Sequence, residues 1–165
     1  MNRAPLALFL VGLSALALAQ DPVDDAPRPG EGLGLRLGGW FPSRTGSDQG
    51  FSYGVGYLLP SVKPLRYEVE YYGSSARFTN SGGRQNVNLY KIGVNGIYTP
   101  YAQMYYFGAG LGVGGGSGTG SNSADLVVTA LAGYRLNKNL FVEARYQGAS
   151  KSYLNGFGIN IGYRY

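Results

Sequence analysis

Residues 157–165 read FGINIGYRY, an alternation that runs without interruption through the whole stretch. The bulky apolar side chains share one parity, whereas glycine, asparagine and arginine occupy the other. Because successive side chains of a strand point to opposite sides, a period of two predicts a β-strand with one apolar face. The apolar face of this predicted terminal strand consists of Phe157, Ile159, Ile161, Tyr163 and Tyr165.

The sequence ends inside this predicted strand, so no later segment of it can cover the strand's edge. An uncovered edge exposes unpaired backbone N–H and C=O groups, a problem that closed barrels avoid. We therefore expect residues 157–165 to pair with the first strand and close a barrel.

Seven further stretches alternate in the same manner upstream. The fourth changes the face of its bulky residues near Leu89 and Tyr90, which indicates either a bulge or the point where the strand leaves the membrane. Together the stretches predict an all-β fold over residues 33–165: a closed antiparallel up-and-down transmembrane β-barrel of about eight strands. The expected strands are residues 33–40, 51–59, 65–72, 87–98, 103–114, 126–136, 140–146 and 157–165.

Polar segments of unequal length separate these strands. Long loops are expected after the odd-numbered strands, and short turns after the even-numbered ones. This alternation predicts that both termini and the short turns lie on the periplasmic side, whereas the long loops face outward. The expected long loops are residues 41–50, 73–86, 115–124 and 147–155.

The small volume inside the barrel indicates which face of each strand points inward. An eight-stranded barrel encloses only enough space for modest side chains, so the bulky face is expected to point outward and the glycine-rich face inward. An outward apolar face is stable in lipid, and tyrosines near the strand ends suit its two interfaces. We expect Tyr57, Tyr67, Tyr98, Tyr134 and either Tyr163 or Tyr165 on the periplasmic side, and Tyr53, Tyr71, Tyr105 and Tyr146 on the other side or at mid-depth.

The inward parity also carries charges, six basic and three acidic. Glu68 or Glu70 with Glu143 could form the acid pair of a hydrolase, but carboxylates interleaved with arginines favour ion pairing. We interpret the set as a structural lumen charge network. Its members are Arg36, Arg66, Glu68, Glu70, Lys91, Arg135, Glu143, Arg145 and Arg164.

The composition narrows the function classes further. The 165 residues contain no His and no Cys, which excludes the Ser-His-Asp, Cys-His and common zinc constellations, and we expect no cofactor and no metal. The formal charge of +5 is too small and too scattered for nucleic-acid binding. Residues 110–115 satisfy the G-x-G-x-x-G expression, but no helix-forming segment follows to bind a phosphate.

The first 32 residues differ from the rest of the chain. Residues 1–19 combine a basic start, an apolar stretch and Ala17-Leu18-Ala19, which predicts a signal peptide cleaved before Gln20 rather than an anchor helix. Residues 20–32 are rich in proline and charge and are expected to form a disordered periplasmic leader.

The second half of the chain resembles a known family. The residues concerned are Pro100-Tyr101, the glycine-rich 108–112, 132–146 (AGYRLNKNLFVEARY) and the terminal strand. They resemble the small eight-stranded outer-membrane β-barrel superfamily of OmpA-like, OmpX-like and opacity-type proteins. The resemblance implies a location in the cell outer membrane, contact with its lipid, and a terminal strand read by the assembly machinery. It also implies ion pairs that plug the barrel.

Two functions remain open at this stage. The first is a non-enzymatic barrel with a structural or surface-interaction role through its extracellular loops, expected to be a monomer. The alternative is a narrow porin-like channel for small solutes or hydrophobic molecules. An enzyme is disfavoured because the usual general base, His, is missing. Basic residues in the predicted loops are either solvated or in contact with an anionic surface ligand: Arg44, Arg77, Arg84 and Lys151.

Overall fold

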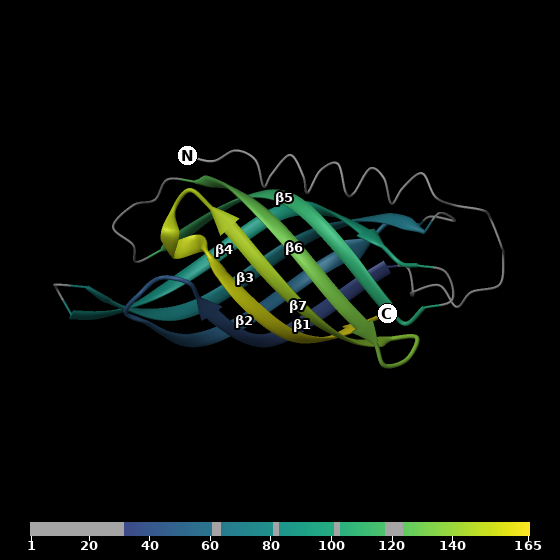
Figure 1. Cartoon of the computed structure of the whole chain (residues 1–165), viewed down its shortest axis with the longest axis horizontal. Helices are drawn as coiled ribbons and strands as arrows, with labels where there is room; N and C mark the ends of the chain where they lie inside the picture. Colours follow the sequence, from purple (N-terminus) through teal and green to yellow (C-terminus); the bar gives the residue numbers. More distant parts are fainter. Residues whose placement is uncertain (1–31, 61–63, 81–82, 101–102, 118–123) are drawn as a thin grey trace.

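The computed structural model describes residues 32–60, 64–80, 83–100, 103–117 and 124–165. Over these residues, eight antiparallel strands pair in sequence order and β8 pairs back with β1, which confirms the predicted closed up-and-down barrel (Figure 1). The predicted signal peptide and almost all of the predicted leader lie outside the described residues. The strands are β1 Gly32–Pro42, β2 Ser47–Leu58, β3 Leu65–Asn80, β4 Gly83–Tyr98, β5 Tyr105–Ser117, β6 Asp125–Arg135, β7 Leu140–Ala149 and β8 Gly156–Arg164.

Closure depends on the ladder between β1 and β8. Its register runs from Gly34 opposite Arg164 to Pro42 opposite Gly156. Every second residue of β8 is buried, and the intervening apolar side chains are exposed, from 39% for Phe157 to 52% for Ile161. The expectation that the terminal strand pairs with the first strand is therefore confirmed.

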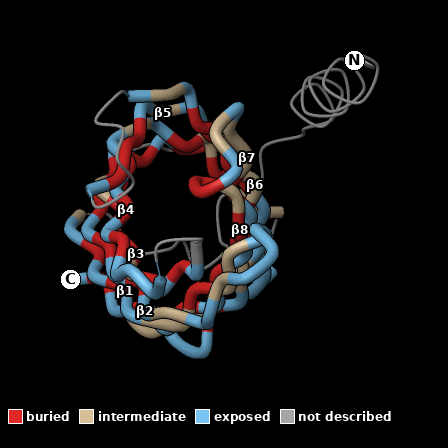
Figure 2. Tube along the Cα trace, turned by 90° about the vertical axis from the view of Figure 1, so that its left-hand side faces the viewer, coloured by how far each residue is buried: buried red, intermediate tan, exposed pale blue. Residues whose placement is uncertain are grey.

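The two faces of the barrel differ as the alternation predicts. Leucine, isoleucine, valine, phenylalanine and tyrosine side chains cover the outside, whereas most charged side chains of the strands are buried inside. Figure 2 shows buried and exposed residues along the Cα trace of the barrel. Closure satisfies the backbone polar groups from strand to strand, so this apolar outer surface is suited to a lipid bilayer. Among the described residues, no helix is long and apolar enough to cross a membrane.

The barrel has two distinguishable ends. At the turn end, β1 begins, β8 ends, and β2, β4 and β6 connect to the strands that follow them. At the loop end, β1, β3, β5 and β7 connect to their successors, and the short 3-10 helix η1, Ser152–Leu154, lies between β7 and β8.

The strands are longer at the loop end than predicted. Residues 41–50 and 73–86 were expected as long loops, but β1 continues to Pro42, β2 begins at Ser47, and β3 and β4 pair without interruption up to Asn80 and Gly83. Gly32, expected in the leader, begins β1. The prediction failed because these segments are polar. A paired hairpin satisfies its own backbone hydrogen bonds and needs no apolar side chains once it extends beyond lipid.

The predicted bulge near Leu89 and Tyr90 is wrong. The register of β4 with both neighbours is continuous there, and Val87 and Leu89 point into the barrel. The bulky residues of β4 change face because the barrel interior is apolar at the depth of Val87 and Leu89. A register shift is found between Asp48 and Phe51 of β2, opposite β3.

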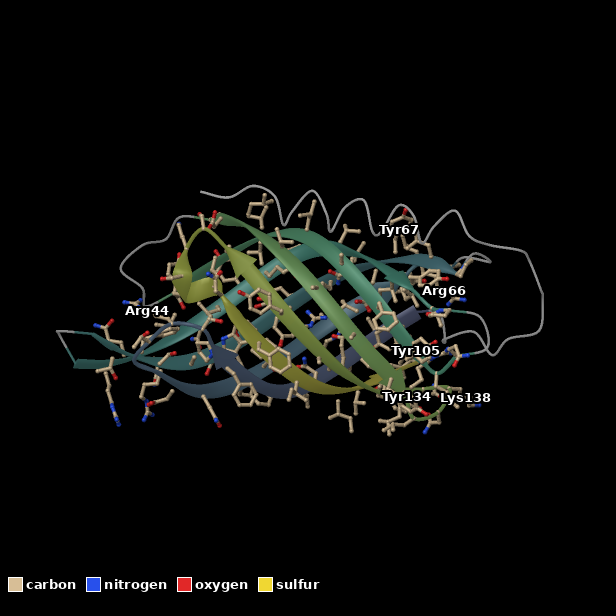
Figure 3. The ribbon with its side chains drawn as sticks, in the orientation of Figure 1. Arg44, Arg66, Tyr67, Tyr105, Tyr134 and Lys138 are labelled. Carbon is tan, nitrogen blue, oxygen red and sulfur yellow. The ribbon has the colours of Figure 1, made fainter. Side chains whose placement is uncertain are left out.

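One tyrosine was also assigned to the wrong end. Tyr105 is the first residue of β5 and lies opposite Tyr134, so it belongs to the turn end (Figure 3). It therefore lies beside the tyrosines expected on the periplasmic side.

We predict that Ile161→Asp prevents assembly of the barrel, and that Tyr163→Asp has a smaller effect. A charge on the lipid face costs up to about 2–4 kcal/mol at mid-depth and less near an interface. Heat-modifiable migration on gels reports assembly. Asn88→Asp, which adds the same charge at an exposed β4 position near the loop end, serves as the control. Normal assembly of the Ile161 variant would contradict the role of this strand.

Candidate functional site

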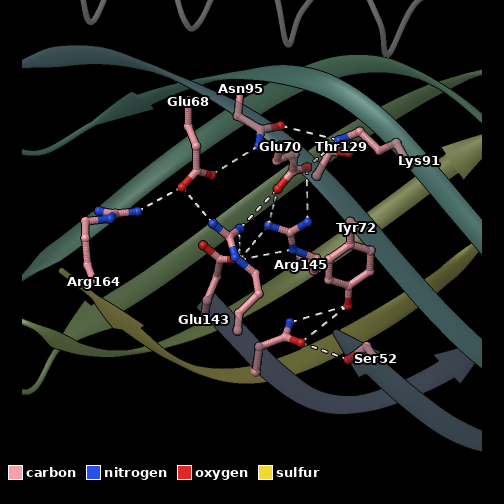
Figure 4. Close-up of polar contacts among 12 residues, drawn as sticks. Ser52, Glu68, Glu70, Tyr72, Lys91, Asn95, Thr129, Glu143, Arg145 and Arg164 are labelled. Atoms are coloured by element: carbon pink, nitrogen blue, oxygen red, sulfur yellow. Dashed lines mark hydrogen bonds and ion pairs between the residues drawn. The ribbon is translucent and has the colours of Figure 1, made fainter. Parts of the chain in front are cut away.

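Charged side chains from five strands meet in the middle of the barrel interior. Each lies at an inward position of its strand, and all are at most 2% exposed except Arg164, whose side chain is 9% exposed. We call this set the central charge network (Figure 4). Its members are Arg36 of β1, Glu68 and Glu70 of β3, Lys91 of β4, Glu143 and Arg145 of β7, and Arg164 of β8.

Glu70 is the most highly connected carboxylate. It accepts hydrogen bonds from Lys91 Nζ at 2.7 Å, from Arg36 Nη1 at 3.1 Å, and from both terminal nitrogens of Arg145 at 3.2 and 3.0 Å. The Lys91 ammonium also donates to Thr129 Oγ1 at 2.5 Å. One carboxylate thus holds cations that belong to three other strands.

Arg36 connects the other two carboxylates. It donates to Glu68 Oε1 at 2.7 Å and to Glu143 Oε1 at 3.2 Å. Glu143 also accepts from Arg145 at 2.7 Å, and Glu68 accepts from Arg164 at 2.8 Å. Every carboxylate of the network therefore contacts at least two cations, so none is available as a general acid or base.

Neutral groups complete the network. Asn95 Nδ2 lies 3.5 Å from Glu68 Oε2, and the Tyr106 hydroxyl donates to Glu143 Oε2 at 3.1 Å. The Arg145 guanidinium lies over the Tyr72 ring, 4.2 Å from its centroid. Sequence reasoning did not assign roles to these residues, although their inward parity was visible.

Apolar clusters border the network on both sides. Along β4, the inward residues are Val87 and Leu89, then Lys91 and Asn95, and then Ile97. The loop-end cluster contains Trp40, Tyr72, Ala76, Phe78, Val87, Leu89, Val127, Tyr153 and Leu154. The turn-end cluster contains Leu58, Ile97, Tyr106, Leu131 and Phe141.

Glycines on the inward face make room for these side chains. A Cβ atom at Gly56 would lie 2.8 Å from Glu68 Cδ and 3.1 Å from Arg36 Nη2. A Cβ atom at Gly162 would lie 2.1 Å from Phe141 Cζ. Real Cβ atoms do not approach so closely, so the large inward side chains require glycine on the neighbouring strands.

The remaining two residues of the predicted lumen network lie at the turn end. Arg66 is buried near the start of β3, and Arg135 is the last residue of β6, where its Nη2 donates to the Gln103 carbonyl at 2.6 Å. The glutamates contact Arg36, Lys91, Arg145 and Arg164. Parity identified the inward charges, but it could not distinguish their depths or partners.

The basic residues assigned to outer loops occupy different elements. Arg44 follows β1 and lies over the Phe78 ring, with its Cζ 5.7 Å from the centroid. Arg77 and Arg84 are exposed residues of β3 and β4, so their assignment to a loop was wrong. Lys151 precedes η1, and its backbone N–H donates to Asp125 Oδ2 at 2.8 Å.

The loop between β7 and β8 folds over the loop-end mouth. Tyr153 and Leu154 of η1 are buried in the loop-end cluster. The segment is held by the Asp125 carboxylate, which accepts from Ser150 Oγ at 2.7 Å, and by Asn155 Oδ1, which accepts from the Ala149 N–H at 2.6 Å. Over the described part of the chain, no group of three or more His, Cys, Asp and Glu side chains could hold a metal ion.

Comparison with solved structures identifies the fold. The outer membrane protein Ail of Yersinia pestis, solved in complex with the heparin analogue sucrose octasulfate, superimposes with a TM-score of 0.58 at 15% identity. The match covers 82% of this chain and all of Ail. Neisserial surface protein A superimposes with a TM-score of 0.54 at 21% identity, over 81% of this chain and 95% of that protein. No protein-family model matches the sequence, and no curated protein matches it significantly.

These likenesses and the apolar outer surface define the class. The chain has the fold of small eight-stranded outer-membrane β-barrels, as the sequence resemblance predicted. Ail is an outer membrane protein and was also solved in a phospholipid bilayer nanodisc, in agreement with the expected location of this chain in the outer membrane.

We predict that Glu70→Gln destabilises the barrel by about 3–5 kcal/mol, because the substitution leaves several buried cations without their shared counterion. Urea unfolding of the protein in detergent micelles measures the change. Asp48→Asn removes an exposed carboxylate from the same barrel and is expected to have little effect. Adding Lys91→Met to Glu70→Gln should restore part of the loss, because one uncompensated charge disappears. Equal stability of the wild type and Glu70→Gln would contradict the network's structural role.

Proposed function

We propose that this protein is a non-enzymatic outer-membrane barrel that anchors a contact surface at its loop end. The proposal rests on the β3–β4 hairpin, because its strands extend beyond the band of apolar side chains on the outside of the barrel. Tyr90 is the last large apolar side chain on the outer face of β4, whereas Asn88, Asn86 and Arg84 are exposed polar residues beyond it. Paired strands give this projection a defined surface, which an unstructured loop would lack.

We further propose an anionic partner for this surface. Arg77 and Arg84 lie on the outward face of the hairpin, opposite Asn86 and Thr79 respectively. The described loop-end side chains comprise four basic residues, Arg44, Arg77, Arg84 and Lys151, and two acidic ones, Asp48 and Asp125. Four basic against two acidic side chains leave a net positive charge at this end. The sulfated ligand of Ail offers a model for the chemistry, namely several anionic groups on one sugar.

The narrow channel is the less favoured function. The central charge network and the two apolar clusters fill successive depths of the interior, and η1 covers the loop-end mouth. Conduction would require these groups to separate, and breaking buried ion pairs is costly.

Export and assembly complete the proposal. We propose that the signal peptide is cleaved before Gln20 and that the outer-membrane assembly machinery recognises the apolar face of the terminal strand. The inserted barrel would be a monomer with its turn end toward the periplasm. The outward apolar alternation of β8 supports this role of the terminal strand.

We predict that purified protein in detergent binds sucrose octasulfate and that Arg77→Gln together with Arg84→Gln weakens binding roughly tenfold at low salt, with a smaller loss at high salt. Isothermal titration calorimetry measures the affinity. Arg77→Lys together with Arg84→Lys, which keeps both charges at the same positions, is the matched control and should bind nearly as the wild type does. Wild-type affinity of the protein with Arg77→Gln and Arg84→Gln would show that the hairpin does not attract the ligand.

A further inference from the structure

The turn end contains a small cavity inside the barrel mouth. Its volume is about 10 Å³, enough for one water-sized group. Tyr106 and Phe141 of the turn-end cluster lie on its inner side, and the connection between β6 and β7 borders it. Arg135 and Arg164 complete the lining. This position is at the opposite end of the barrel from the proposed contact surface.

The lining carries only positive charge. Arg135, Lys138 and Arg164 contribute three cations, and none of the described residues that line the cavity is Asp or Glu. The counterion of Arg164 is shared, because Glu68 Oε1 accepts from Arg164 Nη2 at 2.8 Å and also from Arg36 Nη2 at 2.7 Å. Arg36 also contacts Glu70 and Glu143, but the central charge network has four cations for three carboxylates, so one positive charge remains in excess.

Arg164, which lines the cavity, also has one buried N–H group without an acceptor among the described residues. Arg164 Nε makes no hydrogen bond to any described residue, although only 8% of Arg164 is exposed. An unsatisfied buried N–H of a charged group is unfavourable, and an anion or a water molecule would satisfy it.

The cavity walls are held in place without a ligand. Asn137 Oδ1 accepts from the backbone N–H groups of Asn139 and Leu140 at 2.9 and 2.8 Å. Asn139 Nδ2 donates to the Arg164 carbonyl at 2.6 Å, and the Arg164 N–H donates to the Asn139 carbonyl at 2.8 Å. The Arg164 guanidinium lies over Phe141, 5.2 Å from the ring centroid. Such preorganisation lowers the entropic cost of binding.

We propose that this turn-end mouth binds a phosphate group. One phosphate oxygen enters the cavity and accepts from Arg164, while the remaining oxygens stay at the rim within reach of the exposed Lys138. Arginine and lysine are the side chains best suited to phosphate, and the positive charge of the lining complements its negative charge. Free phosphate and a phospholipid headgroup both have this chemistry. A headgroup can reach the mouth because Tyr67, Tyr105 and Tyr134 lie at the same end of the barrel, at the expected depth of the membrane interface (Figure 3).

The test is an NMR titration of the purified protein in a non-ionic detergent with inorganic phosphate at constant ionic strength. We expect saturable shifts of the Arg164 Nε–H and Tyr106 ring resonances. Lys138→Gln should lower the affinity about tenfold, the loss expected from one charge-assisted contact, and Arg84→Gln at the loop end should leave it unchanged. Lys138 lies in an exposed turn, so its substitution does not threaten folding.

A second titration, with short-chain phosphatidic acid, distinguishes the two sources. Saturation by inorganic phosphate identifies the free ion as a sufficient ligand. Saturation by the lipid alone, lost in Lys138→Gln, identifies a headgroup. The proposal is overturned if neither probe saturates, or if Arg84→Gln weakens binding as much as Lys138→Gln does.

Discussion

A single carboxylate, Glu70, holds cations from three other strands of the barrel, and the rest of the interior is arranged around it. Arg36, Lys91 and Arg145 approach it from β1, β4 and β7. Buried charges are stable only when they are paired and hydrogen-bonded. This contact therefore requires a closed barrel, since only closure brings β1, β3 and β7 to face one another. It also explains why Glu68 and Glu143 lie within reach of the same arginines.

The limited interior volume determines which residues surround the charges. An eight-stranded barrel has room for its own side chains and little else. Gly56 and Gly162 show how that room is divided, because a methyl group at either position would collide with Glu68 or Phe141. Glycines on the inward face thus leave the space that the inward arginines and other large side chains occupy. The same packing places charged and apolar side chains at successive depths of the interior.

Most of the fold could be predicted from the sequence because a single rule, alternation, governs every strand. It identified the pairing of the terminal strand, the outward apolar face and the inward charges such as Arg36 and Glu143. Alternation carries no information on depth, however, so the partners of each glutamate and the end occupied by Tyr105 needed the structure. It also fails where few apolar side chains mark a face: residues 73–86 contain only Ala76 and Phe78, both inward, and were taken for a loop.

The central claim is that ion pairs and apolar clusters close the lumen of an otherwise typical membrane barrel. The most direct measurement is the conductance of the wild-type protein in a planar lipid bilayer at neutral pH. This account predicts no sustained ohmic current, because the central charge network occupies the lumen between two apolar layers. A stable open pore with defined ion selectivity would contradict it.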